Sequence, residues 1–426
     1  MRFWVVILLF AAAAFGAESD GKVFMIPVEG EGAKYWPRWR GPSGQGDVVG
    51  KGYVDTWSPT ENVLWSVEVP GRGNSSPIVW GDRIFTNTSY DDGKRRVILC
   101  FRRSDGKLLW EAAAPEAKPE QSYMKNGHAS STPVTDGKLV YAYFGNHGLM
   151  AVDFDGKLVW HRSFGEFNAY HGTACSPLIY KNSIIIYQEQ QRGGKSFIAA
   201  FDKTTGKPLW ETERQARVGW NSPVAVHVDD HDEIIVHSMQ KVIAYDPASG
   251  RELWQCKGNT FEVMPTPVVG HGLVYCSSGR AGPTLAIKPG GSGDVTETNV
   301  VWKKERGSPF VPAPILVGDT LYLINDMSSI VTAFDAKTGD QFWQARLGEA
   351  ARESFSAAPV AFDGKIFVTN DEGTTFVFAH GREFQLLRTN SLGEGTIASP
   401  ALVDGIWYIR TAKHLWAIGK PAANRR

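Results

Sequence analysis

A small residue followed by proline occurs eight times along this chain, at a nearly constant spacing. The eight pairs are Ser76-Pro77, Thr132-Pro133, Ser176-Pro177, Ser222-Pro223, Thr266-Pro267, Ala313-Pro314, Ala358-Pro359 and Ser399-Pro400. Successive prolines lie 56, 44, 46, 44, 47, 45 and 41 residues apart. Because a repeat period of about 20 to 50 residues is typical of solenoids and propellers, this spacing predicts eight similar units.

Each unit shows the alternation expected of a sheet protein. In the unit that begins at Thr132, apolar and polar residues alternate between turn signals at Asp136-Gly137, at residues 146–148 and at Asp155-Gly156. Asp, Asn and Gly adopt the positive φ angles of tight hairpins with little strain, so these turns separate four short antiparallel strands. The proline begins the first strand, where its missing N–H costs least.

Eight four-stranded units without helical periodicity predict an all-β fold, an eight-bladed β-propeller of four-stranded antiparallel blades. Several units end in the motif A-x-D-x-x-[TS]-G-x-x-x-W, and we expect the tryptophan to pack between neighbouring blades. The tryptophans at the ends of the units are Trp110, Trp160, Trp210, Trp254, Trp302 and Trp343. The seventh unit has Gln385 at this position, and the fifth has an insertion, residues 288–299, before its fourth strand.

The two ends of the repeat region predict how the ring closes. The last unit contains only three strands, whereas residues 61–70, "ENVLWSVEVP", form a strand without a partner and carry a further tryptophan, Trp65. We expect this N-terminal strand to complete the last blade. That pairing removes two exposed sheet edges, which are otherwise prone to aggregation.

Residues 62–420 are thus assigned to the propeller, and three other segments are expected. Residues 1–17 have the features of a secretory signal peptide, with Arg2 before an apolar core and small residues at the cleavage site. Residues 18–61 form an N-terminal extension, in which "WPRWRGP" is too rich in proline and arginine for a strand and is expected to pack across one rim. Residues 421–426 are expected to be a disordered tail.

These segments predict a periplasmic or secreted protein. No cysteine lies near the cleavage site, so we expect no lipid anchor there. No later apolar run approaches the roughly 20 residues of a membrane-spanning helix.

The charge balance of 45 basic and 45 acidic residues argues against nucleic acid or an anionic membrane as a partner. We expect a monomer. The cysteines Cys100, Cys175, Cys256 and Cys276 are widely spaced, and a chain of this size buries enough apolar surface without disulfides, so buried single thiols are expected. A bridge between Cys256 and Cys276 is the alternative.

The A-x-D-x-x-[TS]-G-x-x-x-W repeat, the [ST]-P strand openings and the leading "WPRWRGP" resemble the PQQ-like repeat propellers, a family of exported bacterial proteins. The resemblance extends from Trp36 to Lys420 and implies the same eight-bladed fold. It also implies two classes of function. Quinoprotein dehydrogenases of this kind hold pyrroloquinoline quinone (PQQ) and Ca²⁺ on the axis and oxidise alcohols or sugars, whereas the propeller lipoprotein of the outer-membrane β-barrel assembly machine is a non-catalytic binding scaffold.

The residues favour the second class. Quinoprotein alcohol dehydrogenases stack the cofactor beneath a disulfide between adjacent cysteines, and this chain has no two neighbouring cysteines. No Glu, Asn and Asp set for calcium is found by motif, so no catalytic or metal-binding residue is assigned. We therefore predict a non-catalytic binding or scaffold protein. The alternative is a PQQ- and Ca²⁺-dependent dehydrogenase with a divergent site around His128, His171 and Trp220, and PQQ and Ca²⁺ are implied only by the resemblance.

In a propeller, the loops that lead into the innermost strands converge on the mouth of the central channel. These loops predict a polar ring that binds a protein or a small polar ligand. The candidate residues are Arg72, Asn74, His128, His171, Arg217, Trp220, Asn221, Glu262, Arg352 and Glu394. The two histidines have the chemistry of bases or metal ligands. The competing interpretation is that these polar groups satisfy loop backbone and water.

Overall fold

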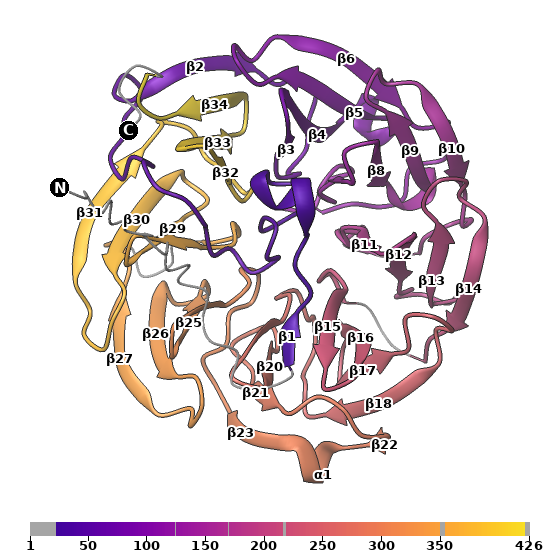
Figure 1. The fold of residues 1–426 in the computed structure, drawn as a ribbon, viewed down its shortest axis with the longest axis vertical. Helices are drawn as coiled ribbons and strands as arrows, with labels where there is room; N and C mark the ends of the chain where they lie inside the picture. The colour runs from indigo at the N-terminus through magenta and orange to yellow at the C-terminus, as the bar shows by residue number, and fades with distance from the viewer. Residues whose placement is uncertain (1–22, 124, 169, 216–218, 350–353, 422–426) are drawn as a thin grey trace, which may run out of the picture.

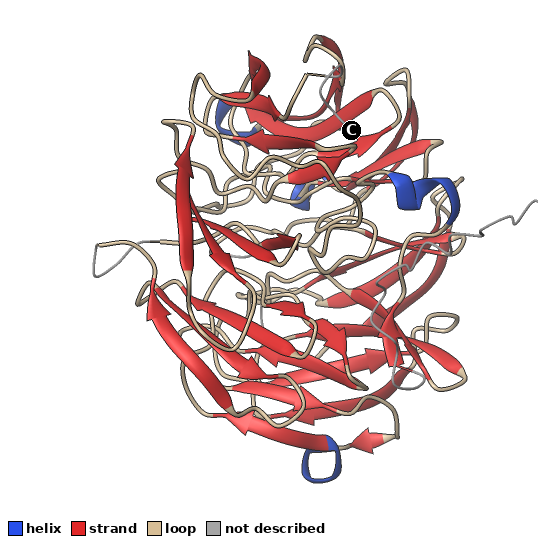
Figure 2. Ribbon diagram, turned by 60° about the vertical axis from the view of Figure 1, so that its left-hand side comes forward, coloured by secondary structure: helices blue, strands red, loops and turns tan. Residues whose placement is uncertain are grey.

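The computed structural model describes residues 23–123, 125–168, 170–215, 219–349 and 354–421. Eight antiparallel blades are arranged radially around a central axis (Figure 1), which confirms the predicted eight-bladed propeller. A second view shows that most of the molecule is strand, with helices confined to short segments between the strands (Figure 2). The predicted signal peptide and residues 422–426 of the predicted tail lie outside the described residues.

The strands follow one another from the axis outward in each blade. Blades one to four contain β3 (Ile78–Trp80), β4 (Arg83–Tyr90), β5 (Arg95–Arg102) and β6 (Leu108–Ala113); β7 (Val134–Thr135), β8 (Leu139–Tyr143), β9 (Leu149–Asp153) and β10 (Leu158–Arg162); β11 (Leu178–Tyr180), β12 (Ser183–Gln188), β13 (Phe197–Asp202) and β14 (Pro208–Glu213); β15 (Val224–Val228), β16 (His231–His237), β17 (Lys241–Tyr245) and β18 (Glu252–Lys257).

Blades five to eight contain β19 (Val268–Gly270), β20 (Leu273–Ser277), β21 (Thr284–Ile287) and β23 (Val300–Lys304); β24 (Ile315–Val317), β25 (Thr320–Asn325), β26 (Ile330–Asp335) and β27 (Gln341–Arg346); β28 (Val360–Phe362), β29 (Lys365–Thr369), β30 (Thr374–Ala379) and β31 (Leu386–Ser391); β32 (Ala401–Val403), β33 (Ile406–Arg410), β34 (His414–Ile418) and β2 (Val63–Glu68). The described helical segments are η1 (Gly30–Lys34), η2 (Asp91–Gly93), η3 (Gly145–His147) and α1 (Thr296–Asn299). No helix within the described ranges is long and apolar enough to cross a membrane.

The ring closes as predicted. Strand β2 pairs antiparallel with β34, with Val63 opposite Ile418 and Glu68 opposite His414. Blade eight therefore takes three strands from the C-terminal end and its outermost strand from the N-terminal side (Figure 1).

Blade four carries two additional strands. Strand β1 (Val23–Met25) pairs antiparallel with the innermost strand β15, so the sheet gains a strand on its axial edge. On the outer edge, β22 (Gly293–Asp294) pairs in parallel with β18. Strand β22 and helix α1 belong to the insertion of blade five, which thus covers the rim of its neighbour.

The N-terminal extension crosses the hub, whereas we expected it on one rim. Its indigo ribbon passes over the centre of the wheel in Figure 1. Backbone hydrogen bonds join Trp36 to Val79 of blade one and residue 48 to Ala361 of blade seven. The Arg40 guanidinium, 1% exposed, donates to the Pro314 carbonyl at 2.7 Å in blade six. Proline and arginine keep this segment out of a sheet but let it bond to the inner ends of several blades.

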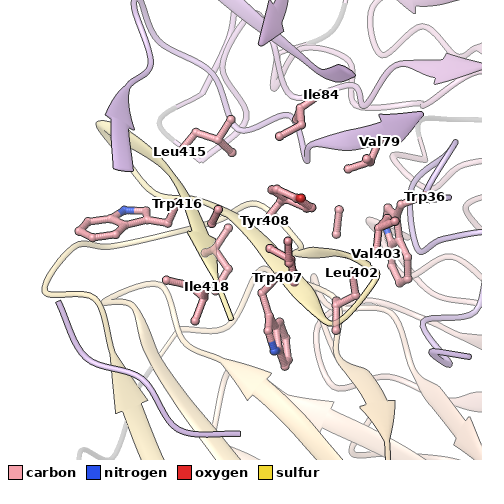
Figure 3. Close-up of a cluster of buried hydrophobic side chains, with 14 of the residues drawn as sticks. Trp36, Val79, Ile84, Leu402, Val403, Trp407, Tyr408, Leu415, Trp416 and Ile418 are labelled. Carbon is pink, nitrogen blue, oxygen red and sulfur yellow. The ribbon is translucent and has the colours of Figure 1, made fainter. Parts of the chain in front are cut away.

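A large apolar cluster lies where the first and last blades meet the extension (Figure 3). In that view Trp36 lies beside Leu402 and Val403 of β32. The cluster also contains Trp57, which is 3% exposed and whose ring centroid lies 4.9 Å from that of Trp407. The extension is therefore part of the core.

The Asp, Gly and Trp of the recurrent A-x-D-x-x-[TS]-G-x-x-x-W motif each have a structural reason. The Asp side chain accepts backbone N–H groups of the following turn, as Asp202 does from residues 204 and 205. The glycine of one blade lies under the tryptophan of the preceding blade: a Cβ on Gly206, which has φ +68°, would lie 2.6 Å from the Trp160 ring. Each copy of the motif thus supplies a glycine that leaves room for the tryptophan of the preceding blade, and a tryptophan that packs over the glycine of the following blade.

The unit tryptophans lie between blades, and most donate the indole N–H to a carbonyl of the following blade. The bonds run from Trp65 to Arg103, Trp110 to Phe154, Trp160 to Lys203, Trp210 to Pro247, Trp302 to Ala336 and Trp343 to Gly381, at 2.8 to 3.2 Å. Trp254 donates instead to the Glu233 carboxylate of its own blade, because the insertion replaces the usual turn of blade five.

Candidate functional site

A cavity of about 400 Å³ lies on the axis, at the end where the loops enter the innermost strands. Trp39 of the N-terminal extension lines it, together with residues from loops of all eight blades. This volume lies within the range of about 300 to 1,000 Å³ that is typical of small-molecule sites. The position agrees with the predicted channel mouth.

The small residues before the prolines form a ring of hydrogen bonds around this cavity, which we call the hydroxyl ring. Each member accepts the backbone N–H of the corresponding residue in a neighbouring blade. The bonds run from Ser76 N–H to Thr132, Thr132 to Ser176, Ser176 to Ser222, Ser222 to Thr266, Ala358 to Ser399 and Ser399 to Ser76, at 2.9 to 3.1 Å. The ring is interrupted at Ala313 and Ala358, which have no hydroxyl group.

Four of the predicted site residues line the cavity: Asn74, His171, Trp220 and Glu262. The structure does not place Arg72, His128, Asn221 or Glu394 in its wall. Arg217 and Arg352 lie outside the described residues.

His171 and Trp220 form an aromatic wall. Their ring centroids lie 5.7 Å apart in an edge-to-face arrangement, and the ring centroids of Tyr123 and His171 lie 5.1 Å apart. The Trp220 indole N–H donates to the Gly172 carbonyl, so the ring is held in place. The His171 Nδ1 is buried and has no hydrogen-bond partner.

The charged groups around the mouth are already paired with one another. Glu262 accepts from the Arg280 guanidinium at 2.5 Å, and this hydrogen bond raises the pKa of Arg280 despite partial burial. Lys125, in a loop of blade two, donates to Asp371 of blade seven at 2.7 Å. These two blades are not neighbours, so this ion pair spans part of the mouth.

His128 is held in a structural network beside the mouth. Arg96 and Glu120 form a bidentate ion pair at 2.8 Å with almost no exposed surface. The same guanidinium lies 3.0 Å from the His128 Nδ1, and Ser122 lies 3.2 Å from its Nε2. Burial, together with the Arg96 charge, lowers the pKa of His128. Neither ring nitrogen is therefore free for a ligand.

Three other predicted residues serve the loops around the site. The buried Asn221 side chain donates to the His237 carbonyl. Glu394 accepts from His414 and Thr411, and although burial opposes them, these hydrogen bonds lower its pKa. Arg72 is exposed, and its backbone pairs with Ser89.

An acidic residue that the sequence did not single out supports the apolar side of the cavity. Asp326 accepts the backbone N–H of Phe310 at 2.7 Å and that of Val311 at 3.4 Å. Burial raises the pKa of Asp326 to about 6, against the opposing effect of these hydrogen bonds and of the Lys125 charge. Phe310 and Val311 themselves line the cavity.

Sequence reasoning missed several lining residues. Lys125 and Asn126 stand just before His128, and Phe310 stands in the loop that leads to Ala313-Pro314, so proximity to a small-Pro pair was their available signal. Arg280 lies in the hairpin between β20 and β21, which the entry-loop rule does not cover. Trp39 belongs to the extension, whose path across the hub no repeat pattern predicts.

The hub does not have the ligands that the calcium site of a quinoprotein needs. Ca²⁺ takes six to eight oxygen ligands, usually with several carboxylates. Among the described lining residues, Glu262 supplies the only carboxylate, and it holds Arg280. Within the described ranges, no group of three or more His, Cys, Asp and Glu side chains is arranged to hold a metal ion.

The cysteines do not supply the disulfide of those enzymes. Cys100, Cys175, Cys256 and Cys276 are all free and buried, in agreement with the expectation of single thiols. Burial raises the pKa of Cys175 to about 12 and that of Cys256 to about 11, so both thiols stay protonated and unreactive.

Comparisons with known proteins agree with this fold. The family model described as "Outer membrane protein assembly factor BamB" matches residues 48–166, 94–345 and 326–420. The protein of that name from Burkholderia pseudomallei (strain K96243) is 25% identical over 296 residues, which are 67% of this chain and 70% of the relative.

Two solved structures share the architecture at low sequence identity. BamB from Moraxella catarrhalis superposes with a TM-score of 0.62 and 14% identity, covering 84% of this chain and 99% of its own. The quinohemoprotein alcohol dehydrogenase from Comamonas testosteroni has a TM-score of 0.67 and 12% identity, covering 91% and 81%. Because the family match covers nearly the whole propeller, this chain belongs to the PQQ-like propeller family described as outer membrane protein assembly factor BamB.

Proposed function

We propose that this chain is a non-catalytic binding protein of the cell envelope and that its ligand, or a group of its partner, enters the hub cavity. The observation that carries the proposal is the cavity itself. Trp39, His171 and Trp220 give it aromatic surface, and its charged side chains Lys125, Arg280 and Glu262 are paired. Such a site can hold a ligand, but its described lining residues offer no poised nucleophile or unpaired carboxylate for chemistry.

The location rests on two observations. Residues 1–17 have the composition of an export signal. The relatives are named for a part in assembling outer membrane proteins, which supports a role in the same compartment and a scaffold-like activity.

A blocking variant tests the hub as the binding site. Ala174 lines the cavity, and Ala174→Trp would fill it. Ala113 is exposed on β6 at the outer rim, so Ala113→Trp is the matched control. Native mass spectrometry of protein purified from the envelope should detect a bound small molecule in wild type and in Ala113→Trp, but not in Ala174→Trp. Retention of the same molecule by Ala174→Trp would place the binding site elsewhere.

The dehydrogenase alternative has its own test. Purified protein is incubated with PQQ and Ca²⁺, and the quinone absorption spectrum and dye-linked oxidation of alcohols and sugars are followed. We expect neither a shifted spectrum nor turnover above a protein-free control. Turnover that disappears in Ala174→Trp would show that the hub is a catalytic site.

A further inference from the structure

Hydroxyl donors without a partner line one side of the hub cavity. Five members of the hydroxyl ring lie in its wall: Ser76, Thr132, Ser176, Ser222 and Thr266. Each oxygen already accepts a backbone N–H of a neighbouring blade. Since a hydroxyl carries one proton of its own, each keeps a donor that finds no acceptor among the described residues. Blades one to five therefore present an arc of free O–H groups.

Two further polar atoms of the wall lack partners. Asn126 donates its amide N–H to the His171 carbonyl at 2.6 Å, but its buried Oδ1 has no donor. The buried His171 Nδ1 has none either. Both residues line the cavity and carry unmatched hydrogen-bonding capacity, which favours a ligand that both accepts and donates hydrogen bonds.

The rest of the cavity is apolar. Trp39 lines the cavity, and its indole N–H already donates to the Ser399 hydroxyl oxygen at 3.1 Å, so Trp39 offers a ligand carbon surface. Phe310, Val311 and Ile397 line the side where Ala313 and Ala358 interrupt the hydroxyl ring. The cavity therefore has a polar arc facing an apolar arc, and Trp39 adds aromatic surface to its wall.

The electrostatics favour an uncharged ligand. Lys125 and Arg280 are the described cations of the wall, and each is neutralised by a carboxylate within 2.7 Å. A ligand carboxylate or phosphate would have to displace one of these partners, whereas a neutral ligand leaves both ion pairs intact.

From these four properties we infer that the hub cavity binds a neutral saccharide, one or two sugar rings in size. A pyranose carries hydroxyls around its edge that donate and accept, which matches the hydroxyl ring, Asn126 and His171. Its C–H faces match the aromatic surface of Trp39. The volume of about 400 Å³ accommodates such a ligand but not a folded partner. This inference rests on the proposed role of the hub as a binding site.

The test uses isothermal titration of the full chain with maltose, cellobiose and N,N′-diacetylchitobiose, beside trigalacturonate, tetra-alanine and PQQ. We expect at least one neutral disaccharide to bind. Asn126→Ala and Thr132→Val should each weaken that binding about three- to tenfold, as expected for the loss of one hydrogen bond. The control matched to Thr132→Val is Thr60→Val, which changes a residue outside the cavity and should bind as wild type.

The possible failures are distinguishable. If no neutral saccharide binds at about 10 mM, where even millimolar affinity is detectable, the saccharide inference is wrong. If the peptide, the acidic sugar or PQQ binds instead and Ala174→Trp abolishes that binding, the ligand class is wrong and the hub function stands. If saccharide binding survives in Ala174→Trp, both proposals fail. Thermal melts show whether Thr132→Val is folded. If it is not, the saccharide affinity of Asn126→Ala still tests the inference.

Discussion

At the scale of single residues, the contact between one blade's tryptophan and the next blade's glycine explains the repeat motif. Gly206 both adopts a positive φ and leaves room for the Trp160 ring, which is 8% exposed. The sequence alone predicted that the tryptophans pack between blades. It did not show that the glycine four residues before the next tryptophan receives the ring, because that contact joins positions about 45 residues apart in different sheets.

Replacing this glycine separates backbone strain from packing. Gly206→Ala places a Cβ 2.6 Å from the Trp160 ring, whereas Gly272→Ala, at φ +76°, meets nothing within 4 Å. Both variants place an alanine at a positive φ and so strain the backbone, but only Gly206→Ala also displaces an indole ring. We expect Gly206→Ala to lower the free energy of unfolding by about 1–3 kcal/mol more than Gly272→Ala in urea titrations. Equal losses would mean that the indole contact contributes little.

A buried histidine beside the hub predicts a pH dependence. Burial lowers the pKa of His237 to about 4. In the unfolded chain this histidine takes up a proton near pH 6.5, whereas in the folded chain it takes one up only near pH 4. Between these two pH values the unfolded state binds more protons, so the free energy of unfolding falls as the pH drops. The slope contributed is up to about 1.4 kcal/mol per pH unit.

His237→Gln removes this titration. Asp326, whose pKa is raised to about 6, titrates in the opposite sense over the same range, but it is present in both proteins and cancels in the comparison. Denaturant unfolding between pH 7 and pH 4.5 should show a shallower loss of stability for His237→Gln than for wild type. Parallel curves would contradict the assignment.

At the scale of the elements, the small-Pro pairs have two functions. The proline stands immediately before the innermost strand, and the hydroxyl of the residue before the proline accepts a backbone N–H of the preceding blade, which ties the two blades together. Alternation and turn residues were sufficient to predict the strands, because the buried face of a blade requires a period of two. The hydroxyl ring was not predictable, since its bonds depend on how neighbouring blades approach at the axis.

Thr132→Val tests this link between blades. The substitution preserves shape but leaves the buried Ser76 N–H without an acceptor. We expect a loss of about 1–3 kcal/mol in the free energy of unfolding. Thr60→Val, at an exposed hydroxyl whose side chain contacts only Ser58, should cost less than about 0.5 kcal/mol. If both variants lose less than about 0.5 kcal/mol, the hydroxyl ring does not contribute measurably to stability.

The seventh blade lacks the tryptophan that ends most other blades, and a tryptophan of the N-terminal extension packs against it instead. The sequence placed Gln385 at the tryptophan position, but the strand register puts Arg388 there, since Val377 pairs with Arg388 as Ala333 pairs with Trp343 in blade six. The extension supplies Trp57 against Phe367 of that blade and Trp407 of the eighth. The Trp57 backbone N–H is held by Asn390 of β31 at 3.3 Å. The missing residue was visible in the sequence, but its substitute, more than 300 positions away, was not.

Trp57→Ala should therefore weaken one interface selectively. Because the indole is almost fully buried, we expect a loss of about 3–5 kcal/mol. Hydrogen exchange should rise in β31 and β33 and stay unchanged in β12 and β13, on the opposite side of the wheel. A uniform increase over all blades would contradict a local role.

At the scale of the whole molecule, eight blades close into a ring through β2 and β34, and the extension then crosses the axis and lines the hub cavity through Trp39. The repeat number and the closing strand followed from the sequence. The cavity followed only in outline: Asn74, His171, Trp220 and Glu262 line it, but His128 is held by Arg96, and Trp39 comes from the extension. Side-chain partners across blades decide which loop residues remain free, and no local pattern records them.

The hub as the ligand site is tested most directly by a crystal structure grown with the saccharide that binds most tightly in the titrations. We predict density for a sugar ring in the axial cavity, against the face of Trp39 and within hydrogen-bond distance of Asn126 and Thr132. Density for the sugar on the outer rim or between blades, with only ordered water in the hub, would contradict it.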